Sequence, residues 1–168
     1  MSSCGTDTAV SLPCMFSSLT KSDYSHAQGK NMSNALDVLS TAGVEVLWRD
    51  NNSSSKSVAD RVEYQDYQSD NVNTICDIEC RDEGMLVGLQ AYIDERQDKD
   101  ITIVLHMMGS HGPAYYKRYP EAFEKFKPVC KTNQLNECNN KQINNAYDNT
   151  ILYADYFLSK VIGLLQSN

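Results

Sequence analysis

The sequence lacks an apolar run long enough to cross a membrane. Its uninterrupted apolar runs are short, such as Ile103–Leu105, and the stretch from Ile101 to Met108 counts only if Thr102 and His106 are included. A membrane-spanning helix needs about 20 predominantly apolar residues. The first residues also lack the basic and apolar stretches of a secretory signal. The 168 residues therefore predict no membrane span and no export signal.

The sequence also lacks an excess of basic residues. Fifteen Lys and Arg stand against 22 Asp and Glu, which leaves a formal net charge of −7. Nucleic-acid-binding domains show a clustered basic face, and anionic lipid surfaces attract polybasic segments. The charge balance therefore argues against nucleic acid as a partner and against binding of anionic lipid by a polybasic segment.

No Pro- or Gly-rich linker and no internal repeat divides the chain, whose length is about that of one domain. Apolar residues recur at helical spacing over 31–41, from Met85 to Ile93 and over roughly 143–165, which predicts three helices. The predicted apolar face of the last helix consists of Ala146, Tyr147, Ile151, Ala154, Leu158, Ile162 and Leu165. Gly43 is expected to end the first helix, because glycine tolerates positive φ.

Short apolar segments at 44–48 and 101–105 each follow one of these helices and predict strands. Helices that alternate with short strands indicate an α/β domain with a mainly parallel sheet. The polar segments 53–73 and 131–142 show no period, so we expect surface loops there.

Cysteine is plentiful, and the six cysteines fall as three close pairs. The pairs are Cys4 with Cys14, Cys76 with Cys80, and Cys130 with Cys138. This clustering favours three local disulfides, although a metal site and reduced core thiols are the alternatives. Disulfides persist in oxidising compartments such as the periplasm. Without an export signal, they imply either that a signal was removed or that the chain is part of a longer protein.

Two polar loops follow the predicted strands, over 49–56 and 106–113. Open α/β sheets bind ligands where loops leave the carboxyl ends of strands. The second loop holds His106 and His111, whereas His26 lies in a polar stretch and is expected at the surface. The alternative is that both loops are ordinary solvated loops and that these histidines are structural.

Small hydroxyl residues precede a short apolar segment near the N-terminus. Thr6, Asp7 or Thr8 could cap a helix there, and a helix N-terminus suits a phosphate or sulfate. A hydroxyl in this place can act as a nucleophile when a metal lowers its pKa. The alternative is an ordinary capped helix with a disulfide.

Several segments together resemble one family. They are Ser3–Ala9, Leu12–Ser17, Trp48–Asn52, Glu79–Asp82, His106, Gly109, His111–Tyr115, Lys117–Tyr119 and Asn145–Asn149. They are similar to the bacterial phosphoethanolamine transferases that modify lipid A or core lipopolysaccharide, including the mobile colistin-resistance enzymes. The match runs in order over nearly the whole chain.

The resemblance implies an alkaline phosphatase-like (sulfatase-type) α/β/α sandwich, incomplete in this chain. In the family this is a periplasmic domain tethered to the inner membrane by N-terminal helices. The family moves phosphoethanolamine from phosphatidylethanolamine to a phosphate or sugar of lipopolysaccharide and releases diacylglycerol. Its nucleophile is a zinc-bound threonine that becomes phosphorylated, and the matching position is Thr8.

The resemblance also assigns further site residues. Positions matching Asn52, Lys56 and His111 bind the phosphoethanolamine group, and His111 is also a candidate ligand of a second metal. The three cysteine pairs match family disulfides, although the Cys76–Cys80 loop is shorter than in some relatives.

One part of the family's pattern is missing. Its zinc needs a glutamate upstream and an Asp-His pair downstream, and no Asp-His dipeptide occurs in this chain. We therefore expect residues 1–168 to be an internal fragment, inactive by itself, without the membrane helices and the remaining zinc ligands. Two alternatives are a sulfatase or phosphatase of the same superfamily and a non-catalytic, disulfide-stapled binding module. A sulfatase would need Cys or Ser at the position of Thr8.

Overall fold

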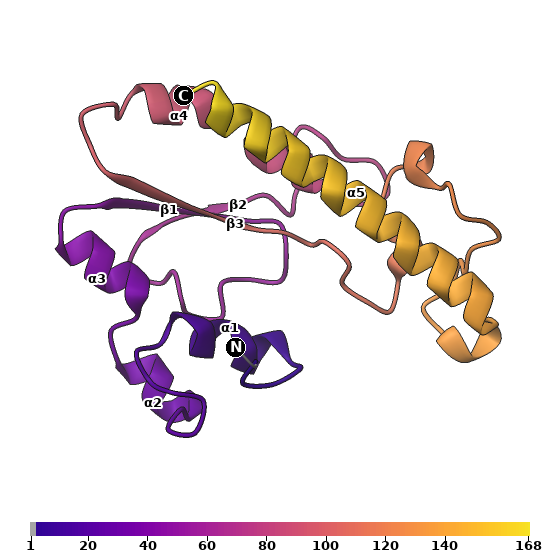
Figure 1. The fold of residues 1–168 in the computed structure, drawn as a ribbon, viewed down its shortest axis with the longest axis horizontal. Coiled ribbons are helices and arrows are strands. Elements are labelled where there is room, and N and C mark those ends of the chain that lie inside the picture. The colour runs from indigo at the N-terminus through magenta and orange to yellow at the C-terminus, as the bar shows by residue number, and fades with distance from the viewer. Residues whose placement is uncertain (1–2) are drawn as a thin grey trace. The chain divides into compact units, whose positions relative to one another are not determined.

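A computed structural model describes residues 3–168, apart from the side chain of Lys30. The chain forms two compact units, which are described one at a time. The first unit extends to Asp66 and includes Ala91–His106, and the second consists of Tyr67–Gln90 and Met107–Asn168. Figure 1 labels the helices and strands of both.

The first unit is built on a three-stranded parallel sheet. The strands are β1 (Glu45–Asp50), β2 (Glu63–Asp66) and β3 (Ile101–His106), in the order β2-β1-β3. Both neighbours run parallel to β1. The predicted α/β class with a parallel sheet is therefore confirmed, and the two predicted strands are β1 and β3.

Helices α1 (Thr8–Phe16) and α3 (Ala35–Thr41) lie on the same side of this sheet, as Figure 1 shows, and α2 (His26–Asn31) lies between them in sequence. The core between helices and sheet consists of Leu36, Val46, Trp48, Val58 and Ala59, with Leu12, Phe16 and Leu39 packed against it. Val46 and Trp48 are two residues apart, so both side chains point to the helix side of β1.

Helix α3 begins later than its apolar pattern predicts. The expected helix starts at residue 31, but Asn34 caps α3 with its side chain and completes a capping box with Asp37. Asn34 also donates from Nδ2 to the Val58 carbonyl (2.8 Å), which ties the helix start to the core. Gly43, with φ +91°, ends the helix as expected.

The prediction of a loop over 53–73 is wrong in part, because β2 lies within it. Strand β2 is an exposed edge strand, so its side chains show no apolar alternation. Its support comes from backbone pairing with β1 and from the hydrogen bond that Arg49 Nε donates to Gln65 Oε1 (2.9 Å).

The single helix predicted from Met85 to Ile93 is in fact two elements. A 3-10 turn, η1, spans Asp82–Leu86, and α4 spans Leu89–Asp94. Gly88 lies between them with φ +69°, a backbone conformation that a continuing helix does not allow. Three further 3-10 turns in the second unit are η2 (Tyr115–Lys117), η3 (Glu121–Phe123) and η4 (Leu135–Glu137).

The long helix of the second unit is α5 (Asn140–Gln166), which confirms the last predicted helix. Its buried residues are Ala146, Asn149, Thr150, Tyr153 and Phe157. Most of the apolar face predicted to pack is exposed instead, including Leu158, Ile162 and Leu165. The face of α5 that packs includes the polar residues Asn149 and Thr150, so a pattern of apolar residues alone does not identify it as the buried face. Within residues 3–168, no helix is both long and apolar enough to cross a membrane.

Asn149 shows how that polar face works. Its Oδ1 accepts hydrogen bonds from the Lys125 and Phe126 amides (2.9 Å each), and its Nδ2 donates to the Phe126 carbonyl (3.0 Å). A fully buried amide thus holds the segment that precedes α5 against the helix.

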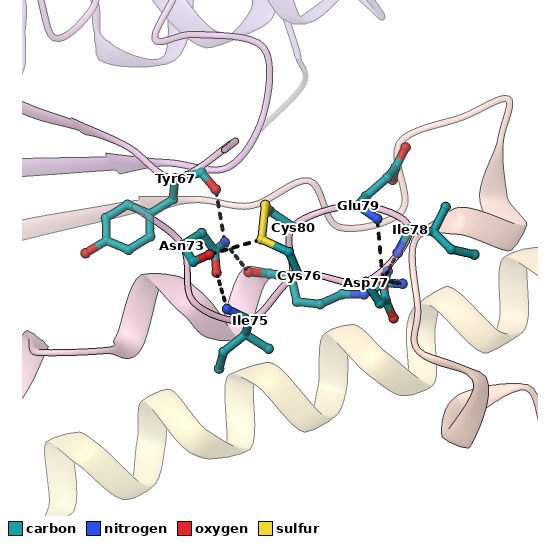
Figure 2. Close-up of a disulfide and its surroundings, with 9 residues drawn as sticks. Tyr67, Asn73, Ile75, Cys76, Asp77, Ile78, Glu79 and Cys80 are labelled. Atoms are coloured by element: carbon teal, nitrogen blue, oxygen red, sulfur yellow. Dashed lines mark hydrogen bonds and ion pairs between the residues drawn. A yellow bond between two sulfur atoms is a disulfide. The ribbon is translucent and has the colours of Figure 1, made fainter. Parts of the chain in front are cut away.

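Three disulfides are present, Cys4–Cys14, Cys76–Cys80 and Cys130–Cys138. Figure 2 shows the turn closed by Cys76–Cys80 and the buried side chain of Asn73 beside it. Asn73 Nδ2 donates to the carbonyls of Tyr67 (3.0 Å) and Arg81 (2.9 Å), and its Oδ1 accepts from the Ile75 amide (3.0 Å). Asn73 therefore binds both ends of this disulfide-closed turn.

Gly84 is the close neighbour of Asn73, and a Cβ at this position would overlap the Asn73 amide. We expect Gly84→Ala to lower the free energy of unfolding by about 1–3 kcal/mol, as overpacking of a core does. The matched control is Gly163→Ala in α5, where a Cβ meets open space. That change should raise stability by about 0.5–1 kcal/mol, because alanine favours a helix. Chemical denaturation measures both, and equal effects would contradict the packing of Asn73.

Candidate active site

Thr8 is the first residue of α1, and the preceding Asp7 is the helix cap. The Asp7 carboxylate accepts a hydrogen bond from the Ala9 amide (2.8 Å), which is the N-cap geometry. Of the three residues proposed from the sequence, Asp7 is therefore the one that caps. The Cys4–Cys14 disulfide joins the residues before Thr8 to the body of the helix. Thr8 itself is half-buried, with its hydroxyl in the first turn.

Asp50 ends β1 and is fully buried. Its Oδ2 accepts hydrogen bonds from Trp48 Nε1 (2.8 Å) and from His106 Nδ1 (2.9 Å). Its Oδ1 accepts from the backbone amide of Asn52 (2.8 Å). The sequence places His106 at this strand end but gives no sign of a role for Asp50, because pairing across strands is not visible in a local pattern.

Burial of Asp50 acts to raise the pKa of its carboxyl. The hydrogen bonds from His106 and Trp48, the electrostatic interaction with His106 and the hydrogen bond from the Asn52 amide outweigh burial and hold this pKa below its ordinary value. For Tyr64 on β2, burial and then the nearby charges of Asp50 and Asp66 raise the pKa to about 12. At neutral pH the site therefore contains an ionised Asp50 and a protonated Tyr64.

The turn after β1 carries two of the predicted binding residues, Asn52 and Lys56. Asn52 is buried, and Lys56 Nζ donates to the carbonyl and the hydroxyl of Ser53 (2.9 and 2.8 Å). Ser54, Lys56 and Ser57 have φ values of +110°, +51° and +69°. Non-glycine residues in this region are strained, and such strain clusters at ligand sites.

A hollow of about 480 Å³ lies beside this turn. Lys56, the neighbouring serines, Asp60 and Tyr64 line it. The hollow therefore offers an ammonium group, several hydroxyls and a carboxylate within one concave surface. Groups of both charges and several hydrogen-bond donors suit a small zwitterionic ligand.

His111 lies in the second unit, whereas Thr8, Asn52 and Lys56 belong to the first. It is exposed, and Arg118 Nε donates to its carbonyl (2.7 Å). The loop before it is held by buried Asp82, which accepts hydrogen bonds from the amides of Met108 (2.8 Å) and Gly109 (3.0 Å). Asp82 lies two residues after Cys80, so the residue that holds this loop is close in sequence to the Cys76–Cys80 turn.

The described residues do not by themselves fit a zinc site. Over residues 3–168, no group of three or more His, Cys, Asp or Glu side chains could hold a metal ion. The six cysteines are in disulfides, and Thr8 offers one hydroxyl oxygen. Zinc sites in proteins need three or four protein ligands. What these residues supply is the hydroxyl of Thr8 at the start of α1 and the amide of Asn52 and ammonium of Lys56 in the turn after β1.

Comparison with known proteins identifies the family. A profile of the family described as Sulfatase matches residues 1–168. Phosphatidylethanolamine transferase Mcr-2 of Escherichia coli is 50% identical over 175 residues, which cover 100% of this chain and 32% of that protein. The chain thus spans about a third of the length of this curated relative.

Two solved structures have the same fold at high identity. One is the soluble domain of lipooligosaccharide phosphoethanolamine transferase A from Neisseria meningitidis (TM-score 0.88, 45% identity, 95% of this chain and 48% of that one). The other is the integral membrane form of that protein (TM-score 0.92, 44% identity, 98% of this chain and 31% of that one). The sulfatase-type α/β fold expected from the sequence is thereby confirmed.

The buried Asp50 carboxylate makes stability depend on pH. A carboxyl whose pKa is lowered in the folded state stabilises the fold above its unfolded pKa of about 3.9 and loses that effect as the pH falls through its folded pKa. We expect Asp50→Asn to lower the free energy of unfolding by about 1–3 kcal/mol at pH 7, because buried donors lose an acceptor.

The difference between wild type and Asp50→Asn should shrink as the pH falls below about 4, because the carboxyl of the unfolded wild type then takes up a proton more readily than that of the folded protein. Denaturation at a series of pH values measures this. Asp70→Asn, at an exposed carboxylate, is the control and should leave stability unchanged. A difference that stays constant down to pH 2 would contradict the ionised state of Asp50.

Proposed function

The chain belongs to the sulfatase family, and on that premise we propose that it is part of the catalytic domain of a phosphoethanolamine transferase. One observation carries the proposal: the chain is 50% identical, over its whole length, to a protein named phosphatidylethanolamine transferase. The match includes the N-terminal segment that places Thr8 in the first turn of a capped helix. A threonine there, in place of Cys or Ser, favours transfer over sulfate ester hydrolysis.

The proposed reaction has two displacements at phosphorus. Thr8 Oγ1 attacks the phosphorus of phosphatidylethanolamine, the bond from phosphorus to the diacylglycerol oxygen breaks, and diacylglycerol leaves with a proton. A phosphate or sugar oxygen of lipid A or core lipopolysaccharide then attacks the phosphothreonine. Thr8 leaves as the alkoxide and regains a proton. Such reactions depend mainly on positioning and on charge stabilisation at the phosphoryl oxygens.

Asn52, Lys56 and His111 are proposed to bind the phosphoethanolamine group. An ammonium and an amide N–H suit phosphoryl oxygens, and the N-terminus of α1 adds backbone N–H groups. The hollow beside Lys56 also contains the Asp60 carboxylate, whose charge complements the ethanolamine ammonium. The groups in the hollow thus match both charges of the ligand.

We propose that the longer protein binds the zinc that the resemblance implies. Thr8 would be one ligand, and His111 would serve a second metal. When bound, zinc lowers the pKa of an attached hydroxyl. Residues 3–168 by themselves supply no complete zinc ligand set.

The proposed setting is the periplasmic face of the bacterial inner membrane, with residues 1–168 as part of the catalytic domain. The neisserial relative is described as an integral membrane protein, and its soluble domain is about twice as long as the part matched by this chain. Phosphatidylethanolamine as donor and lipid A as acceptor both lie in membranes. Three disulfides fit an oxidising compartment.

Thr8→Ala tests the nucleophile in the full-length protein that contains this chain. We expect diacylglycerol release from phosphatidylethanolamine to fall by more than roughly a thousandfold, as when other nucleophiles are removed. Thermal unfolding should stay the same, because the helix cap is Asp7. Thr6→Ala is the matched control and should keep its activity.

The products decide between transfer and hydrolysis. Wild-type protein should modify lipid A and release little free phosphoethanolamine. Free phosphoethanolamine as the main product would instead show a hydrolase of the same superfamily. Full activity in Thr8→Ala would remove Thr8 from the mechanism.

Zinc titration of the 168-residue chain tests where the remaining ligands lie. We expect calorimetry to show that the 168-residue chain does not bind one zinc ion per chain in the way that structural zinc sites do. The Thr8→Ala variant of this chain should give the same result. The full-length protein should bind zinc, and Thr8→Ala should weaken that binding. Tight binding by the 168 residues, lost in Thr8→Ala, would show that this chain alone completes the site.

A further inference from the structure

We propose that Asp50 and His106 form a positioning pair that sets the backbone at Asn52 and so aims its side chain at the phosphoethanolamine group. This inference rests on the proposed function for the role of Asn52, and the contacts of the pair are independent of it. Asp50 and His106 are the last residues of β1 and β3 and are partners in the sheet register. The pair therefore lies at the carboxyl edge, where open α/β sheets bind ligands.

The two oxygens of the Asp50 carboxylate have separate tasks. Oδ2 is held by Trp48 Nε1 and His106 Nδ1, both on strands, at 2.8 and 2.9 Å. The Trp48 and His106 rings also meet edge to face, with centroids 5.4 Å apart. Because Oδ2 is fixed by two strand residues, the carboxylate plane cannot turn freely. Oδ1 is thereby aimed at the Asn52 amide, 2.8 Å away.

The turn that receives this contact needs external support. The Asn51 amide donates to the carbonyl of His106 on β3 (2.9 Å), and the next amide, that of Asn52, donates to the Asp50 carboxylate. The start of the turn is therefore held at two successive residues. Beyond them, Ser54, Lys56 and Ser57 have positive φ. Strained residues persist only where the surroundings over-determine them. The Asp50 contact is part of what holds this strained turn.

His106 therefore acts indirectly, by holding the Asp50 carboxylate in place. Since Oδ2 is an acceptor, Nδ1 carries the proton, and the ring acts as a donor that fixes the carboxylate. The His106 side chain is 13% exposed and Asp50 is fully buried, so water competes little for this bond. Buried hydrogen bonds to a charged group are stronger than average. His106 is in this view a positioning residue and not a group that reacts with substrate.

Two substitutions separate positioning from chemistry at His106. Asparagine can place its Nδ2 donor near the position of Nδ1, whereas phenylalanine keeps the ring and removes the donor. In the full-length protein, we expect His106→Phe to raise KM for phosphatidylethanolamine about tenfold, with a smaller change in kcat. His106→Asn should stay within about threefold of wild type. His26→Asn, at an exposed histidine on α2, is the matched control.

Hydrogen exchange gives a readout that does not need activity. The Asn52 amide should be protected in wild type and His106→Asn, and should lose protection in His106→Phe. A double-mutant cycle tests whether His106 acts through Asn52. His106→Phe combined with Asn52→Ala should be no worse than Asn52→Ala alone, because the side chain that His106 helps to position is then already absent.

Three outcomes are informative. Equal loss of kcat in His106→Asn and His106→Phe would overturn the inference and make His106 itself reactive. Unchanged protection of the Asn52 amide in His106→Phe would also overturn it. If wild-type protein transfers no phosphoethanolamine but the protection pattern is as expected, the proposed function fails and the positioning pair is supported.

Discussion

The hydrogen bonds received by the buried Asp50 carboxylate are the interaction on which the first unit's site depends. One carboxylate joins β1 to β3 through His106, ties in Trp48 of the core, and holds the turn that carries Asn52. A buried charge is costly unless it is fully hydrogen-bonded. Here the donors to the carboxylate include Trp48 Nε1, His106 Nδ1 and the Asn52 amide, so its burial becomes a geometric constraint that links core, sheet edge and candidate binding turn.

The second unit also contains a buried carboxyl group that holds a loop through hydrogen bonds from backbone amides. Asp82 is buried and accepts the amides of Met108 and Gly109, in the loop that leads to His111. In both units a buried carboxyl group accepts hydrogen bonds from backbone N–H groups of a loop that follows a strand. These hydrogen bonds fix the loop without covering its outer side. The loops can therefore be both rigid and open to a ligand, as the proposed phosphoryl transfer requires.

Local patterns predicted much of this protein. The parallel α/β class, strands β1 and β3, the long helix α5 and the three disulfides follow from apolar period and cysteine spacing. Exceptions lie where the supporting contact is distant in sequence. Strand β2 is exposed and is held by pairing with β1, and α5 packs through polar residues such as Asn149. Neither feature changes the local apolar pattern.

The sequence by itself determined strands β1 and β3, the long helix α5, the close cysteine pairs and the motif around Thr8, because these depend on residues within a few positions of one another. The tertiary structure alone decided what Asp50 and His106 do. They are 56 residues apart, and only the parallel register of β1 and β3 brings Nδ1 to 2.9 Å from Oδ2. Hydrogen bonds act over such short distances that a pairing of this kind exists only once the sheet has formed.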